Sequence, residues 1–211
     1  MHTVAAPVIW VVASLLASGP LGPSVLRTQE DWLPPAFEER ATQQLADRLS
    51  TLPMGDQPPL SPATRLERAR EAVATFRTTL DEWGLEGTLS RAPTLADLGL
   101  PTSSNRLLDA MGRYQFCSLV LALQAAPSGQ AENFNLQFTA VMGLTAGTMA
   151  VLYLRAPFAA AGGTDQELEA YMTSAGMEAV AARVQEDEAL LDRARAGCTP
   201  IVVELVTKVL T

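Results

Sequence analysis

Histidine and lysine are almost absent from this chain of 211 residues, which carries only His2 and Lys208. Histidine is the usual general base near neutral pH, and it activates serine and cysteine nucleophiles and binds zinc. If the first two dozen residues are removed after synthesis, no imidazole remains for any of these tasks. A phosphate-binding P-loop is excluded too, because no Gly-Lys-Ser or Gly-Lys-Thr occurs. The sequence therefore predicts no catalytic residue, no cofactor and no metal site.

Cysteine is scarce as well, since Cys117 and Cys198 are the only two. In an exported protein, an even and low count predicts one disulfide. This bond would close a loop of about 80 residues, for which chain entropy gives roughly 4–5 kcal/mol of stabilisation before strain is subtracted. The alternative is a pair of buried free thiols. A catalytic thiol is not expected, because no imidazole is available to activate it.

Charged side chains are few, and acidic ones predominate. Charged residues make up 18% of the chain, the formal net charge is −8 and the isoelectric point is near 4.7. Nucleic-acid binding requires basic side chains that neutralise phosphates, so a nucleic-acid partner is not expected. The hydrophobic share of 48% is enough to build a sizeable core. A chain of this length fits a single domain.

The N-terminal segment has the outline of a secretory signal. Residues 8–17 are densely apolar and are followed by small residues and turn formers, and the apolar stretch is too short to span a bilayer comfortably. We expect a signal peptide over 1–24 with cleavage somewhere in 17–24, and a helical domain over 25–211 that is exported to the periplasm or the extracellular space. The absence of early Lys or Arg and the presence of Pro20 leave an uncleaved anchor or a misassigned start as alternatives.

Apolar spacing predicts helices over most of the remaining chain. The apolar residues of 35–52 and of 62–83 each fall on one helical face, and Gly84 stands where a helix usually stops. Residues 85–105 are expected to be irregular. A helix from about 105 to 126 follows, and its second half is apolar all round, which is typical of a helix buried in the middle of a fold.

Two further helices are expected towards the C-terminus. A capping box that begins at Thr164 precedes a helix over 165–195, and the apolar stripe shifts at Gly176, which leaves a kink or a new helix there as the alternative. Thr199-Pro200 is interpreted as the cap and first residue of the last helix, on which Glu204 and Lys208 would form an i,i+4 ion pair. The β-branched content of this last segment leaves a strand as the alternative.

One uncharged run, from Phe134 to Leu154, admits three interpretations. Alternating polar and apolar residues at its start fit a pair of strands with a turn between Gly143 and Gly147. Its 21 residues are long enough for a membrane span. Only 14 of them are apolar, however, which makes insertion marginal. A helix buried inside a soluble bundle is therefore favoured over the other two.

These elements together predict an all-α fold, a single-domain bundle of five or six helices after the N-terminal export segment. Residues 114–126 and 134–154 would form its dry centre. The amphipathic helices at 35–52, 62–83 and 165–195 would wrap around that centre, and the disulfide would tie the central helix to the start of the last one.

Carboxylates are the remaining candidates for acid–base chemistry. Such groups could drive glycoside hydrolysis if two of them faced each other across a cleft, but they lie on polar helix faces beside arginines, which favours solvated surface. The candidates are Glu38 with Glu39, Asp81 with Glu82, and the run Glu186, Asp187 and Glu188. Trp32, Trp83 and the tyrosines could line a ligand pocket, but packing in the core or between helices is favoured.

Three functional hypotheses follow. The first is an exported, non-enzymatic interaction or structural module that contacts another protein through an apolar groove. The second is a membrane-associated protein that inserts 134–154, and the third is a carboxylate-dependent hydrolase. The missing residues favour them in that order.

Overall fold

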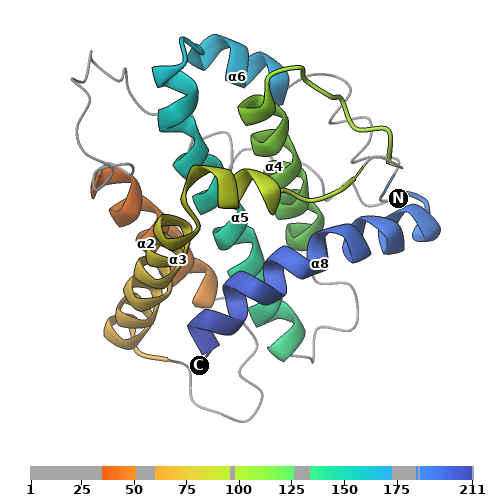
Figure 1. The fold of residues 1–211 in the computed structure, drawn as a ribbon. Coiled ribbons are helices and arrows are strands. Elements are labelled where there is room, and N and C mark those ends of the chain that lie inside the picture. The colour runs from red at the N-terminus through yellow and green to blue at the C-terminus, as the bar shows by residue number, and fades with distance from the viewer. Residues whose placement is uncertain are drawn as a thin grey trace.

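The protein is all-α, as the sequence predicts. The computed structural model describes residues 35–50, 60–95, 98–125, 134–172, 184 and 186–210. The described helices, drawn in Figure 1, are α2 (Pro35–Leu49), α3 (Pro62–Ser90), α4 (Arg106–Ala125), α5 (Phe134–Ala160), α6 (Asp165–Met172) and α8 (Glu188–Leu210). The predicted signal segment lies outside the described residues.

The uncharged run forms α5, the helix at the centre of the bundle. Every residue from Ala140 to Arg155 is buried. α5 contacts α2, α3, α4 and α8, and Figure 1 shows it passing between them. The buried-helix prediction is confirmed and the strand-pair alternative is wrong. The helix also runs beyond the predicted end, through Arg155 and Pro157 to Ala160.

The tightest packing in the centre is between α4 and α5. A Cβ atom added to Gly147 would lie 2.1 Å from Ser118 Oγ and 3.1 Å from the backbone oxygen of Tyr114, so only a hydrogen atom fits there. The buried hydroxyl groups of Thr145 and Thr148 donate to backbone oxygens one turn back in α5, at 3.0 and 2.9 Å. Small and hydroxylated residues thus let two helices approach closely while these hydroxyl groups keep hydrogen-bond partners.

α3 departs from the prediction after Gly84. This residue has φ 62° and ψ −175°, a conformation that favours glycine, and it breaks the helix where a stop is predicted. The chain then resumes helical geometry up to Ser90, so the prediction of an irregular segment is wrong for residues 85–90. A contact with α4 stabilises the helix over residues 85–90, because the buried Tyr114 hydroxyl donates a hydrogen bond to Thr88 O at 2.8 Å.

The two C-terminal helices have other boundaries than those predicted. The capping box at Thr164 is confirmed, since its backbone N–H donates to Glu167 Oε2 at 2.8 Å. The helix predicted over 165–195 is not continuous, because α8 begins at Glu188 with Asp187 as its cap, and residues 173–183 and 185 lie outside the described residues. α8 then continues through Pro200 to Leu210, so Pro200 is inside the helix and not at its start. The strand alternative for this segment is wrong as well.

Two hydrophobic clusters result from this arrangement. The larger one is built on α5 and includes residues of α2, α3, α4, α6 and α8. The smaller one lies between α4, α8 and the segment before α4, and we call it the disulfide cluster. Its buried residues are Leu95, Leu98, Phe116, Cys117, Val120, Val184, Ala194 and Cys198.

We predict that Gly147→Ala destabilises the protein by about 1–3 kcal/mol, because its methyl group would overlap α4. Urea unfolding of the purified variant measures this. The matched control is the double variant Gly147→Ala/Ser118→Ala, which removes the nearest obstructing atom and should recover at least about 0.5 kcal/mol as a coupling energy. Equal stability of Gly147→Ala and the parent would show that the two helices are not in close contact.

Candidate functional site

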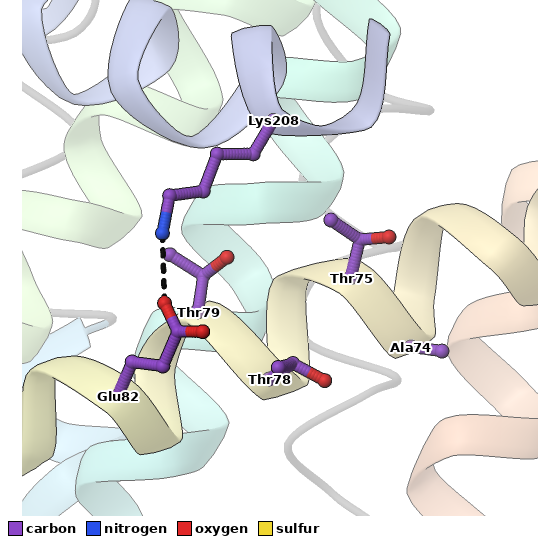
Figure 2. Close-up of a pocket in the computed structure, with 6 residues that line it drawn as sticks. All are labelled: Ala74, Thr75, Thr78, Thr79, Glu82 and Lys208. Atoms are coloured by element: carbon purple, nitrogen blue, oxygen red, sulfur yellow. Dashed lines mark hydrogen bonds and ion pairs between the residues drawn. The ribbon is translucent and has the colours of Figure 1, made fainter. Parts of the chain in front are cut away.

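A shallow groove between α3 and α8 is the candidate site within the described part of the chain. Its volume is about 350 Å³ and it is open to solvent along its length. Figure 2 shows α3 supplying most of its wall, with Lys208 reaching down from α8. The lining residues are Ala74, Thr75, Thr78, Thr79, Glu82 and Lys208. The mixture of methyl groups, hydroxyl groups and one ion pair makes this groove more polar than the one expected from the sequence.

Two ion pairs connect α3 and α8 beside this groove. We call this line of contact between the two helices the α3–α8 seam. Lys208 Nζ lies 2.9 Å from Glu82 Oε2, and Arg91 Nε lies 3.1 Å from Glu204 Oε1. The predicted pair between Glu204 and Lys208 is therefore wrong, because each side chain pairs with α3 instead. All four side chains are at least a third exposed. Each pair therefore stabilises the seam by about 0–1 kcal/mol.

Three of the other candidate carboxylates are also paired with a cation or cap a helix. Glu38 of α2 and Asp81 of α3 both pair with Arg77, so the structure brings them to one cation. Partial burial raises the pKa of Asp81, and the neighbouring Arg77 opposes that rise. Asp187 caps α8, because its carboxylate accepts from the backbone N–H of Ala189 at 2.9 Å. Glu39, Glu186 and Glu188 are exposed.

No group of three or more histidine, cysteine, aspartate or glutamate residues is placed to hold a metal ion in the ranges that the structure describes. The disposition of the carboxylates explains this. The carboxylates in ion pairs are distributed over α2, α3, α4, α6 and α8, and their partners are arginines or Lys208. These pairs either connect two helices or lie along one helix.

The aromatic residues serve packing. Trp83 is half-buried against the larger core, and the Arg91 guanidinium lies 4.6 Å from the centroid of its ring. Trp83 is not among the residues that line the groove. Burial raises the pKa of Tyr114, whose hydroxyl is held as a donor to α3. Trp32, the other tryptophan considered, lies outside the described residues.

Sequence reasoning missed a buried cation, Arg155. Its residue surface is 4% exposed, although it is the first charge after the uncharged run. Its Nε and Nη2 atoms lie 3.2 and 2.8 Å from Asp165 Oδ1, while Nη1 has no hydrogen-bond partner among the described residues. The side chain also lies against the ring of Phe37. Arg155 therefore ties the end of α5 to the first turn of α6 and to α2.

The two cysteines lie at disulfide distance. Their sulfur atoms are 1.96 Å apart, their Cα atoms are 5.4 Å apart, and both residues are buried. The bond joins α4 to the middle of α8, and the prediction that it reaches the start of the last helix is wrong. Close packing accompanies it, since a Cβ atom on the neighbouring Gly197 would lie 2.8 Å from Leu95 Cδ2. The disulfide and the disulfide cluster together fix the position of the first half of α8.

No protein-family model matches the chain, and neither does any curated protein or solved structure. A function is therefore inferred from the sequence and from the geometry described above.

We predict that removing the cross-link, with Cys117→Ala/Cys198→Ala, lowers the free energy of unfolding by up to about 4–5 kcal/mol, because the bond spans 81 residues of chain. Urea titration with and without a reductant measures the loss, which the reductant should reproduce in the parent and not in the variant. The intact mass of the native protein should be lower by two hydrogen atoms than that of the reduced protein. Two free thiols in the native protein would contradict the prediction.

Proposed function

We propose that this chain is an exported, non-enzymatic helical module that acts by contact with another protein. One observation carries the proposal. Of the carboxylates that acid–base chemistry would need, Glu38, Asp81 and Glu82 are in ion pairs that connect α3 to α2 and α8 or lie along α3 itself. A general acid needs a carboxyl group directed at a substrate in a cleft. These groups instead hold helices together.

The α3–α8 groove is the place where contact is proposed. It is open, and Thr78 is exposed at its edge. Threonine side chains offer methyl groups and hydroxyl groups side by side, which suits a peptide segment with small side chains and free backbone amides. A shallow, mixed surface of this kind is typical of protein contacts, because small-molecule sites are usually deeper and more apolar.

Export is supported by two independent features. The apolar N-terminal segment resembles a secretory signal, and cysteines at disulfide distance fit an oxidising compartment. The net charge of −8 argues against a nucleic-acid partner.

The proposal is tested by photo-cross-linking in the native exporting cells. Placing benzoylphenylalanine at Thr78 should give one discrete adduct with another protein, because the probe would lie in the contact. The matched control places the same probe at Ala170, which is exposed on α6. A discrete adduct at Ala170 and none at Thr78 would move the contact away from the groove. Adducts at neither position would overturn it.

A second candidate function is membrane association through α5. The observation that favours it is the character of Gln137–Ala160, 24 residues that are long and apolar enough to cross a bilayer. Against it, 83% of the most apolar window is buried inside the bundle. The helix can enter lipid only after the helices that cover it have moved away.

Fractionation of the expressed precursor separates the two candidates. Under the first, the exported form should begin between residues 18 and 25 and remain soluble after a carbonate wash, since α5 stays inside the bundle. Mass spectrometry identifies the new N-terminus. Retention of the processed form in the carbonate-washed membrane would reverse the order of the two candidates.

A further inference from the structure

We propose that α8 is a cover over α5 that the Cys117–Cys198 disulfide retains, and that reduction of this bond frees α8 and exposes α5 to a lipid bilayer. This inference rests on the second candidate function, because it supplies the movement that membrane association of a buried helix requires.

The surface under the cover is the apolar centre of the protein. α8 contacts α5, and its Leu205 and Val206 are buried in the cluster that α5 organises. α5 has no charged side chain before Arg155. Its buried residues therefore present hydrocarbon to whatever replaces α8, whether water or lipid, and lipid is much the more favourable of the two.

The non-covalent attachment of α8 is uneven. Along the α3–α8 seam, the helices are separated by the groove and connected by two ion pairs between partly exposed side chains. Such pairs contribute little and are weakened by salt. Among the described residues, the firm attachments are Leu205 and Val206 near the C-terminus and the disulfide cluster around Cys198. Of these, only the bond to Cys117 is covalent.

The disulfide joins α8 to α4, the helix that packs most closely against α5. Cys117 is on α4, which packs closely against α5 through Gly147 and does not depend on α8 for that contact. Cys198 is near the middle of α8. Breaking the bond therefore separates the cover from the α4–α5 pair and leaves the pair itself intact.

The chemical step is a thiol–disulfide exchange with a dithiol reductant. One thiolate of the dithiol attacks a cysteine sulfur, the Cys117–Cys198 bond breaks, and the second thiol of the reductant closes on the first. The reductant becomes a disulfide and loses two electrons and two protons, and the two cysteines gain them as thiols. Both sulfurs are buried, so attack occurs when the disulfide cluster opens locally.

The test compares the oxidised protein with Cys117→Ala/Cys198→Ala, a variant that is permanently unlatched. Hydrogen exchange reports the protection of α8 and α5 amides, and flotation with phosphatidylcholine vesicles reports lipid binding. Zwitterionic lipid is chosen because the protein carries a net charge of −8. The matched control is Lys208→Ala, which breaks a seam ion pair and keeps the disulfide.

We expect α8 amides of the unlatched variant to lose protection by about tenfold or more while those of α4 and α5 keep it. This variant should float with vesicles, and the oxidised protein and Lys208→Ala should not. The parent protein treated with a dithiol should behave like the unlatched variant.

Each other outcome counts against a distinct part of the proposal. Unchanged protection of α8 in the unlatched variant would show that the disulfide does not retain α8. Flotation of the oxidised protein would also contradict the role of the disulfide, although membrane association itself would then be supported. Release of α8 without flotation of either protein overturns the membrane function, and this inference with it. Loss of protection throughout, α5 included, overturns the latch, because α8 must leave while the rest of the bundle stays folded.

Discussion

The close approach of α4 and α5 is the constraint on which the rest of the structure depends. Gly147 faces Ser118 and the backbone of α4 at a distance that no side chain tolerates. A helix that is apolar on every side cannot rest on one neighbour, so α5 must also be covered by α2, α3 and α8. The amphipathic helices therefore pack on the apolar surface of α5 that α4 does not cover. The uncharged run dictates the architecture more than any polar motif does.

Local rules accounted for much of this fold. The centre was predictable because two uncharged segments of this length must be hidden from water. Gly84 and the capping box at Thr164 were predictable because their effects operate within one helical turn. The same rules failed for residues 85–90 and for Pro200. In both places tertiary packing keeps a helix going past a residue that normally ends one, and that packing involves α4, which is distant in sequence.

The candidate site was less predictable for the same physical reason. Two cysteines in a chain leave one possible intramolecular pair, so their pairing followed from counting. Glu204 and Lys208 were expected to pair along their helix. Glu204 instead pairs with Arg91 and Lys208 with Glu82, and spacing within one helix does not reveal partners that are distant in sequence. The groove exists only because α3 and α8 cross. Arg155 carried a signal, as the first charge after the uncharged run, but its burial depends on Phe37 and Asp165.

The contact that fixes the centre of the molecule and the contact that can open thus lie in different places. The α4–α5 contact is uncharged and tightly packed, so it responds little to salt or pH. The α3–α8 seam consists of exposed ion pairs around a groove, and the disulfide supplies the firmness that the seam lacks. A protein that needed α8 only as permanent packing would gain more from an apolar seam than from a polar one, because buried hydrocarbon stabilises without covalent help. The combination of a polar seam and a single covalent bond is what a detachable cover requires.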